Sequence, residues 1–358
     1  MRGKAMKTFA VIMAGGGGTR FWPLSRKETP KQLLNLSGRD AMVNETIARL
    51  RRIAERENIF IVTNAAQAEK MASVTAGKLP AGNILKEPSA RNTAACVGYA
   101  AMKILKTRGD GVMIVSPSDA YIRDEAEYAR VLGVAVKAAE TTNALVTVGI
   151  TPTFPATGYG YINFEGDGAV KRVKRFVEKP DLETAKGYLA DGNYVWNSGV
   201  FVWKASVILE KFRTLLSDIY ADLEKLASAF GTPDEEETLN AVYPQIRSIS
   251  VDYGIMEKCG DILVVPGEFG WNDVGSWDMM SVLHEEDADG NIALGDALVL
   301  ESKNTTVYAG SRLVTVVGAD DLVVVETPDA VMVCPRSRAQ DVKKIVDALR
   351  EKGRTEVL

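Results

Sequence analysis

A glycine-rich stretch near the amino terminus carries the residues best suited to holding phosphate. Residues 14–31 read AGGGGTRFWPLSRKETPK and follow the short apolar run FAVIM at 9–13. Glycines let a backbone approach a phosphate closely, and their N–H groups can form a nest for an anion. Arg20 offers a planar fork for phosphate oxygens and Lys31 a flexible point charge. A bare glycine run would suit a flexible surface loop equally well, but the charges and prolines around this one favour a phosphate-binding loop.

The spacing within this stretch excludes the two common phosphate loops. No Gly-Lys-Ser/Thr closes the run, so it is not a P-loop. A G-x-G-x-x-G pattern counted from Gly15 and Gly17 reaches Arg20 where the third glycine should stand. A Rossmann oxidoreductase is disfavoured on this ground, and an acidic residue in the right context is also lacking.

The composition limits the remaining kinds of chemistry. The chain has 358 residues, 46% hydrophobic and 25% charged, with a formal net charge of −4, which is typical of a globular protein and disfavours nucleic-acid binding. The single histidine, His284, excludes a His-rich metal site and a Ser-His-Asp triad. Cys96, Cys259 and Cys334 lie far apart, so we expect neither a zinc site nor a disulfide framework, and a cytoplasmic protein. No apolar run is long enough for a signal peptide or a membrane span.

The first part of the chain alternates apolar runs with helical periodicity. Four buried-strand candidates lie at 9–13, 59–63, 112–115 and 145–150, with helical patterns at 43–54 and 93–106 between them. This alternation predicts right-handed βαβ units, hence a Rossmann-like α/β fold with a mostly parallel sheet and helices on both faces. After residue 150, short glycine-punctuated strands and a helical stretch at 205–226 predict a substrate-facing insertion built on the same sheet.

The end of the chain has a different pattern. Apolar runs begin at 297, 305, 313, 322 and 330 without helices between them, which predicts a small all-β, β-helix-like unit. A stripe of Val342, Ile345, Val346 and Leu349 predicts a closing amphipathic helix. We therefore expect a catalytic domain at 1–288 and a β-helix-like domain at 289–358.

Several motifs, taken in order, resemble the sugar-1-phosphate nucleotidylyltransferases. The loop G-G-x-G-T-R-x-x-P-L-S…P-K is similar to the signature of that family, and the variant FWPLSR at 21–26 resembles its mannose-1-phosphate guanylyltransferases, or GDP-mannose pyrophosphorylases. The further matching motifs are EPSARNTAA (87–95), PSD (117–119), GYGYI (158–162), FVEKP (176–180), WNSGVF (196–201), SVDYG (250–254) and WNDVGSW (271–277). The resemblance spans most of residues 8–280, and it implies a nucleotidyltransferase fold of the GT-A-like type.

The resemblance also implies a reaction. GTP and mannose 1-phosphate would give GDP-mannose and pyrophosphate, with the sugar phosphate attacking the α-phosphorus in line. No protein nucleophile is needed for this transfer, so the protein has to align two anions and neutralise their charge.

Metal and catalytic roles follow by resemblance. Asp119, after the apolar run at 112–115, and Asp273, in a tryptophan-flanked loop, would be ligands of Mg²⁺, which accepts two carboxylates beside phosphates and water. The alternatives are a helix N-cap for Asp119 and a turn-forming role for Asp273. Arg20, Lys31 and Lys179 would be catalytic, although sequence alone would place Lys179 on the surface.

Binding roles are carried over in the same way. Nucleotide binding is implied for Gly15, Gly16, Gly17, Gly18, Thr19, Glu87, Pro88, Asn92, Pro117 and Ser118, with backbone groups near 87–88 and 117–118 facing guanine. Sugar binding is implied for Gly158, Glu178, Asn197, Ser250 and Asp252, whose alternative role is in turns and caps.

The sequence departs from the family pattern in two places. Ala120 stands where the family often has His, and we expect a modest effect because Asp119 remains. Longer members carry an isomerase cupin after the transferase, whereas about eighty residues follow the last motif here, so we expect a single activity.

Two other functions remain open. The same fold could take another sugar 1-phosphate or nucleotide, or serve as a non-catalytic nucleotide-sugar-binding regulatory subunit. A regulatory chain should have lost catalytic charges, and all those predicted here are present. The flanks of β-solenoid coils often pack on a second subunit, so we expect a homodimer.

Overall fold

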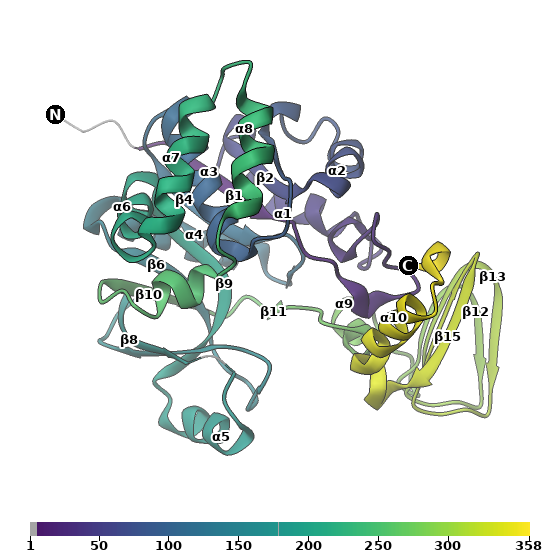
Figure 1. Cartoon of the computed structure of the whole chain (residues 1–358). Coiled ribbons are helices and arrows are strands. Elements are labelled where there is room, and N and C mark those ends of the chain that lie inside the picture. The colour runs from purple at the N-terminus through teal and green to yellow at the C-terminus, as the bar shows by residue number, and fades with distance from the viewer. Residues whose placement is uncertain (1–5, 178) are drawn as a thin grey trace. The chain divides into compact units, whose positions relative to one another are not determined.

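The computed structural model describes residues 6–177 and 179–358, which form two compact units (Figure 1). The first unit comprises Met1–Gly15, Thr46–Ser118 and Ile122–Trp271. The second comprises Gly16–Glu45, Asp119–Tyr121 and Asn272–Leu358. The second unit thus joins the carboxyl-terminal part of the chain to the glycine run from Gly16 onward and the stretch after it. The domain boundary at 288 stays a prediction.

The first unit is built on a nine-stranded sheet. Its strand order is β3-β2-β1-β4-β9-β6-β10-β8-β7, and a separate two-stranded ladder pairs β5 (Tyr121–Ile122) with β11 (Trp271–Asn272). The nine strands are β1 (Thr8–Met13), β2 (Ile59–Asn64), β3 (Ile84–Glu87), β4 (Val112–Pro117), β6 (Leu145–Ile150), β7 (Tyr161–Glu165), β8 (Lys171–Val177), β9 (Tyr194–Lys204) and β10 (Ile262–Gly267). The predicted insertion after residue 150 does extend this same sheet.

The sheet is mixed, but one direction dominates. β3, β2, β1 and β4 are parallel neighbours, and so are β6 and β10. β9 lies antiparallel between β4 and β6, and β8 is antiparallel to both β10 and β7. Seven of the nine strands therefore run the same way, which confirms the mostly parallel sheet, while β9 separates its two parallel blocks.

Helices cover both faces of the sheet. Phe9 and Val11 of β1 are fully buried in a cluster with side chains of α3, α6 and α7. Ala10 and Ile12 are equally buried and point to the opposite face, since side chains alternate along a strand, and α4 packs on that face against β6, β9 and β10. The helices are α1 (Met42–Leu50), α2 (Ala68–Val74), α3 (Asn92–Arg108), α4 (Glu125–Thr142), α5 (Leu182–Asp191), α6 (Ala205–Leu215), α7 (Ser217–Ala229) and α8 (Glu235–Val242).

The carboxyl ends of the parallel strands meet at one edge of the sheet. Met13 at the end of β1 is level with Pro117 at the end of β4, and Asn64 of β2 is level with Glu87 of β3. The glycine run and the Pro-Ser-Asp motif therefore start side by side. Open α/β sheets bind their ligands at this edge.

The second unit contains a small sheet with solenoid character. β12 (Ile292–Leu300), β13 (Thr306–Val317) and β14 (Leu322–Thr327) are parallel neighbours, with Ile292 paired to Thr306 and Thr306 to Val323. These offsets of 14 and 17 residues, with no helix between, are those of stacked coils, and β15 (Ala330–Pro335) returns antiparallel on β14. The β-helix-like unit is confirmed, but the runs predicted at 305 and 313 form one strand, β13.

The core of the second unit joins its distant segments. Phe21 and Trp22 pack with Trp277, with strands β12 and β14, and with the closing helix α10 (Val342–Glu351). Val342 and Val346 of that helix are buried there, so its apolar stripe serves packing. The short helix α9 is Met280–Leu283.

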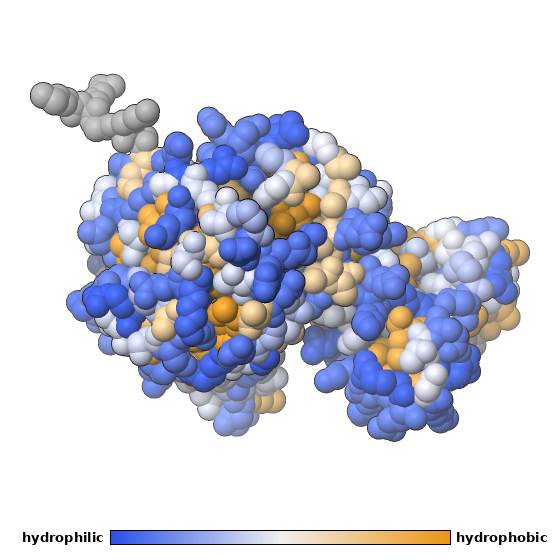
Figure 2. All heavy atoms as spheres, turned by 45° about the horizontal axis from the view of Figure 1, so that its top comes forward, coloured by the Kyte–Doolittle hydropathy of each residue, from blue (hydrophilic) through white to orange (hydrophobic). Residues whose placement is uncertain are grey.

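The surface is largely polar. The face shown in Figure 2 is mostly hydrophilic, with hydrophobic residues in small groups. Among the described residues, no helix combines the length and apolarity needed to cross a membrane.

Candidate active site

The glycine loop leaves β1 as exposed backbone and then folds back on Lys31. Gly16 and Gly17 are exposed, with open space where a side chain would stand. Gly18 has φ +54°, and a Cβ there would lie 2.6 Å from both the Lys31 backbone nitrogen and its Cβ. Only glycine fits this position, and the Gln32 amide fixes the start of the loop by donating to the Gly16 carbonyl at 3.1 Å.

Lys31 connects the two predicted metal ligands. Its side chain is buried, and its ammonium donates to the Asp119 carbonyl at 2.8 Å, to Asp119 Oδ2 at 3.0 Å and to the Asp273 carbonyl at 2.6 Å. An ammonium has three donors, and these are three acceptors. The structure therefore brings Lys31, Asp119 and Asp273 together within the second unit, although they are far apart in sequence.

The local geometry weakens the simpler roles for both aspartates. Helix α4 is capped by Asp124, whose side chain accepts from Ala126 and Glu127, so Asp119 is not its N-cap. The turn at Asp273 is closed by the preceding residue, because Asn272 Oδ1 accepts from the Val274 nitrogen at 2.7 Å.

Val274 holds a strained backbone beside Asp273. Its φ is +44°, a left-handed conformation that β-branched residues rarely adopt, and its side chain is fully buried. Backbone strain of this kind costs of order 1–3 kcal/mol and persists where the surroundings enforce it. The Asp273 loop is therefore held in an unusual conformation.

The two aspartates suit a divalent ion whose coordination is completed by a substrate. Within residues 6–177 and 179–358, no cluster of three or more His, Cys, Asp or Glu side chains could hold a metal. Mg²⁺ typically uses one or two protein carboxylates and takes its other ligands from phosphates and water. The oxygens of Asp119 and Asp273 that meet here already accept from the Lys31 ammonium, so acceptors that suit a cation are present at this point.

The loop after Thr19 is anchored from its inner side. Arg20 is exposed, whereas the next side chain, Phe21, is fully buried with its ring centroid 5.3 Å from that of Trp277. The Trp277 indole donates to the Trp22 carbonyl at 3.2 Å, and the Trp22 indole donates to the Val357 carbonyl at 2.7 Å. Arg20 is thereby presented to solvent from a fixed backbone.

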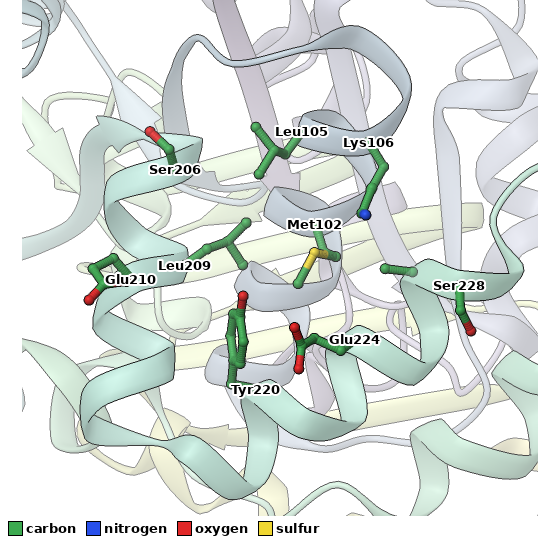
Figure 3. A pocket seen from close by; sticks show the side chains of 10 residues that line it. Met102, Leu105, Lys106, Ser206, Leu209, Glu210, Tyr220, Glu224 and Ser228 are labelled. Atoms are coloured by element: carbon green, nitrogen blue, oxygen red, sulfur yellow. The ribbon is translucent and has the colours of Figure 1, made fainter.

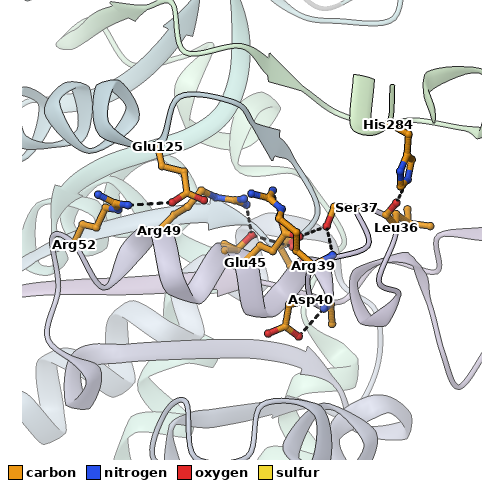
Figure 4. A network of polar contacts seen from close by, with 12 residues as sticks. Leu36, Ser37, Arg39, Asp40, Glu45, Arg49, Arg52, Glu125 and His284 are labelled. Atoms are coloured by element: carbon orange, nitrogen blue, oxygen red, sulfur yellow. Dashed lines mark hydrogen bonds and ion pairs between the residues drawn. The ribbon is translucent and has the colours of Figure 1, made fainter. Parts of the chain in front are cut away.

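The segment that follows Lys31 is held by polar contacts (Figure 4). Arg39 donates to a Glu45 oxygen at 2.8 Å, and Ser37 donates to the other carboxylate oxygen of Glu45. His284, directly after α9, contacts the Leu36 carbonyl at 2.6 Å. The single histidine thus has a structural position at a helix end.

In the first unit, Glu87 lies buried at the carboxyl end of β3, level with the end of β2. The Tyr243 hydroxyl donates to one oxygen of its carboxylate, and the other oxygen lies 3.0 Å from where a Cβ on Gly15 would stand. Burial raises the pKa of Glu87, and the bond from Tyr243 opposes that rise in part. Glu87 is therefore an acceptor placed against the start of the glycine loop.

The other residues predicted to bind the nucleotide differ in their exposure to solvent. Asn92 is exposed at the start of α3 with φ +64°, and its Oδ1 accepts from the Thr93 nitrogen at 2.8 Å. Ser118 is buried, and its backbone nitrogen donates to the Met13 carbonyl at 3.2 Å, which ties the PSD motif to the end of β1. Pro88 and Pro117 are half-buried.

The predicted sugar residues form a second group in the first unit. Asn197 donates through Nδ2 to Asp252 Oδ1 at 2.9 Å and accepts from the Gly199 nitrogen at 3.1 Å. Ser250 belongs to the same turn as Asp252, where its hydroxyl accepts from the Tyr253 nitrogen. Gly158 is exposed with open space around it.

Lys179, predicted to be catalytic, follows β8 in the first unit. Lys179 is exposed, with φ +40°. Glu178 lies outside the described residues.

Sequence reasoning missed several supporting residues. No sequence motif marks Tyr243, because its partner Glu87 is 156 residues away in the chain. Tyr159 lies within a matched motif, and its ring packs edge-on against Trp196 and Trp271, at centroid distances of 5.2 and 5.3 Å. These tryptophans therefore anchor the structure next to Asn197.

A cavity of about 360 Å³ opens between α3, α6 and α7 (Figure 3). Met102, Leu209 and Tyr220 supply its apolar lining, with Lys106 and Glu224 at its border. None of the predicted site residues lines it, so this cavity is not the candidate active site.

Known proteins are similar to this chain in sequence over most of its length. The chain matches the family "Nucleotidyl transferase" over residues 9–290 and the "MannoseP isomerase/GMP-like beta-helix domain" over 295–349. It is 44% identical over 351 residues to the "Xanthan biosynthesis protein XanB" of Xanthomonas campestris pv. campestris (strain B100), covering 97% of this chain and 74% of that protein. It is 40% identical over 371 residues to the "Mannose-1-phosphate guanylyltransferase" of Escherichia coli (strain K12), covering 98% and 75%.

A solved structure agrees with these relatives. The "mannose-1-phosphate geranyltransferase" of Thermus thermophilus superposes with a TM-score of 0.87 at 35% identity, covering 96% of this chain and 100% of that one. These matches confirm the resemblance found in the motifs and the predicted architecture. The chain spans about three quarters of the length of the curated relatives it matches.

Proposed function

Since the chain belongs to the nucleotidyl transferase family, we propose that it transfers GMP from GTP to mannose 1-phosphate, giving GDP-mannose and pyrophosphate. The observation that carries this proposal is the convergence of Asp119 and Asp273 on Lys31, directly beside the glycine loop. Relatives that bear the name mannose-1-phosphate guanylyltransferase support the choice of substrates.

The chemistry requires positioning and charge neutralisation. The sugar phosphate supplies the nucleophilic oxygen and pyrophosphate leaves, so this chain has no bond to make or break itself. The exposed backbone of Gly15, Gly16 and Gly17 would bind phosphate oxygens through N–H groups, and Arg20 would neutralise the leaving pyrophosphate. Alignment of two anions lowers the barrier because the entropy of bringing them together is lost on binding, and charge neutralisation stabilises the transition state further.

A divalent ion, Mg²⁺ in the first instance, would be held by Asp119 and Asp273. When bound, it neutralises negative charge on the phosphate oxygens. The support for this role is that Asp119 and Asp273 both lie against Lys31, and that Mg²⁺ typically uses one or two protein carboxylates and takes its other ligands from phosphates and water.

Base and sugar selection are assigned to the first unit. Guanine presents N1–H and N2–H₂ donors, and the buried Glu87 carboxylate is an acceptor of the kind they need. Pro88, Asn92, Pro117, Ser118 and Thr19 complete the proposed nucleotide contacts. Asn197, Asp252, Ser250 and Gly158 are proposed to hold the hexose, Lys179 its phosphate, and Glu178 its hydroxyls.

The test is pyrophosphate release from purified protein with Mg²⁺, GTP and mannose 1-phosphate, omitting one component at a time. Release that needs all three supports the proposal. A preference for UTP, dTTP or glucose 1-phosphate would contradict the assigned substrates. Tight binding of GDP-mannose without turnover would identify a regulatory subunit instead.

We also propose that the protein is a homodimer that associates through its β-helix-like unit. Large apolar side chains on that unit are exposed, among them Leu313 (57%), Val317 (67%) and Val331 (62%). Exposed apolar groups of this kind often mark protein–protein contacts. Light scattering should give the mass of two chains, and a Leu313→Lys/Val317→Lys variant should give the mass of one; a monomeric wild type at micromolar concentration contradicts the proposal.

The location is proposed to be the cytoplasm. Cys96, Cys259 and Cys334 are free thiols, as a reducing compartment would keep them.

A further inference from the structure

The buried carboxylate of Glu87 is bonded by a residue from a distant part of the chain. Glu87 ends β3 and is 6% exposed, and Tyr243, in the short 3₁₀ turn Tyr243–Gln245 after α8, is fully buried. The Tyr243 hydroxyl donates to Glu87 Oε1. A hydrogen bond to a charged acceptor is stronger than one between neutral groups, and stronger again away from water, so this bond restricts the Glu87 side chain.

The bond divides the two oxygens of Glu87 between two neighbours. Oε1 accepts from Tyr243, whereas Oε2 lies 3.0 Å from where a Cβ on Gly15 would stand. That distance is shorter than an ordinary van der Waals contact, so the glycine at 15 leaves room for Oε2. Because Oε1 is held, the carboxylate cannot turn freely, and Oε2 stays directed at Gly15.

Tyr243 is itself fixed by the segment that follows Glu87. Its ring packs edge-on against that of Tyr99 in α3, with 5.8 Å between the centroids. The carbonyl of the next residue, Pro244, accepts from the Arg91 side chain. A phenylalanine at 243 would pack equally well, so packing does not account for the hydroxyl, whereas its bond to Glu87 does.

A fixed, ionised carboxylate distinguishes the two purine bases. Guanine presents two neighbouring donors, N1–H and N2–H₂, whereas adenine has an unprotonated N1 whose lone pair would face the carboxylate. Repulsion of the wrong ligand contributes to specificity as well as attraction of the right one. A site built for a donor also rejects an analogue that lacks it, because the acceptor of the site is left unpaired.

We propose that Tyr243 is a positioning residue for base selection: its hydroxyl holds the Glu87 carboxylate towards Gly15, in the orientation that favours guanine over adenine. The proposal rests on the function proposed above, in which Glu87 recognises the base, and Tyr243 acts through Glu87. Burial raises the pKa of Glu87 and the bond from Tyr243 opposes that rise, so the same hydroxyl also favours the ionised form, which is the form that only accepts hydrogen bonds.

The test compares GTP and ATP binding in the absence of mannose 1-phosphate. Calorimetry with Mg²⁺, and competition against GTP for the weaker nucleotide, should give a GTP/ATP affinity ratio about 10-fold lower in Tyr243→Phe than in wild type, because one bond to a charged group is lost. The loss should fall on GTP, with ATP affinity little changed. A merely structural role would weaken both nucleotides alike, and an unchanged ratio in folded Tyr243→Phe overturns the proposal.

The matched control is Tyr99→Phe. Tyr99 is 3% exposed and belongs to the same buried cluster, and the substitution removes its hydroxyl while keeping the ring that packs on Tyr243. The GTP/ATP ratio should stay that of wild type. A fall as large as that of Tyr243→Phe would show that any lost hydroxyl in this cluster disturbs the base site, and it would overturn the specific role of Tyr243.

Two further variants separate the possible failures. Glu87→Gln must itself lower the GTP/ATP ratio; if it does not, the assignment of Glu87 to the base is wrong, and the Tyr243 proposal is overturned with it. If Glu87→Gln lowers the ratio and Tyr243→Phe does not, only the role of Tyr243 is wrong. In a Glu87→Gln background, Tyr243→Phe should change the ratio less than about 2-fold, because residues that act as a unit are not additive; a full additional loss contradicts action through Glu87.

The pH dependence of the same ratio gives a second readout. The ratio cancels the ionisation of the triphosphate, which both nucleotides share. Without the bond from Tyr243 the pKa of Glu87 should rise further, so on acidification the preference for GTP should be lost at a higher pH in Tyr243→Phe than in wild type. Cys96 and Tyr99, which also interact with Glu87, have pKa values raised by burial and stay neutral throughout. Coincident pH profiles would contradict the proposal.

Discussion

Replacing Trp277 should reveal how the loop that carries Arg20 is supported. The indole is fully buried, packs on Phe21 at 5.3 Å and on Tyr308 at 5.8 Å between ring centroids, and donates to the Trp22 carbonyl. Truncation of a buried tryptophan to alanine costs about 3–5 kcal/mol in unfolding free energy. Trp277→Phe keeps most of the packing and loses the hydrogen bond, so about 1 kcal/mol is expected.

Urea unfolding followed by circular dichroism measures these differences, and steady-state kinetics on the folded variants tests the link to function. Because Phe21 loses its support next to Arg20, we expect the KM for GTP to rise in Trp277→Ala more than the KM for mannose 1-phosphate. Trp203→Ala is the matched control, since this tryptophan is equally buried but lies in β9 of the first unit. It should lower stability by a similar amount with both KM values little changed. A loss below about 1 kcal/mol in Trp277→Ala, far under the usual cost of such a truncation, would refute the reasoning.

Three other perturbations have defined outcomes. Asn197→Ala removes the side chain bonded to Asp252 and should raise the KM for mannose 1-phosphate about 3- to 10-fold, the value of one neutral hydrogen bond, with the KM for GTP as the internal control. Glu87→Gln should weaken GTP binding about 10- to 100-fold in calorimetry, as expected for a charged acceptor, and equal affinity would exclude Glu87 from base recognition. Glu326, whose pKa is lowered to about 2 by the Ser311 hydroxyl and by further bonds, stabilises the fold fully above its ordinary pKa, and this contribution is lost as pH falls from about 4.5 to about 2. Urea titrations should therefore show Glu326→Gln destabilised at pH 7, with the difference from wild type shrinking steadily as the pH falls from about 4.5 towards about 2; a pH-independent difference would contradict this.

The strands of the first unit were predictable where both of their faces are buried, because such strands are continuous apolar runs in the sequence. FAVIM and IFIVT read as parallel strands because helices cover both faces of the sheet, so that all their positions but Thr63 are apolar. The position of β9 was not predictable from its sequence. It lies antiparallel between β4 and β6, and this pairing depends on contacts with strands that are distant in the sequence. The runs at 305 and 313 were split at Gly310, where a Cβ would lie 2.8 Å from the Glu326 carbonyl. There glycine marks a close approach within a continuing strand and not a turn.

The candidate site was predictable in its residue types but not in its connections. Lys31, Asp119 and Asp273 were found as charges in matched motifs. That Lys31 bonds to two backbone carbonyls could not be inferred, because a carbonyl belongs to every residue and leaves no mark in a sequence. The bond between Glu87 and Tyr243 is a long-range contact of the same kind.

The residues of the glycine-loop motif face two ways: some are exposed to solvent and others are buried in the core of the second unit. Arg20 is exposed and free to meet a phosphate, whereas the next side chain, Phe21, is fully buried. Trp22 and Trp277 then join this inner side of the loop to the closing helix and the strands of the β-helix-like unit. A loop whose exposed face binds a flexible, highly charged ligand must be rigid on its other face, since alignment of two anions fails if the backbone moves. The β-helix-like unit carries no catalytic side chain of its own in our proposal, and its role there would be to hold the loop that carries Arg20.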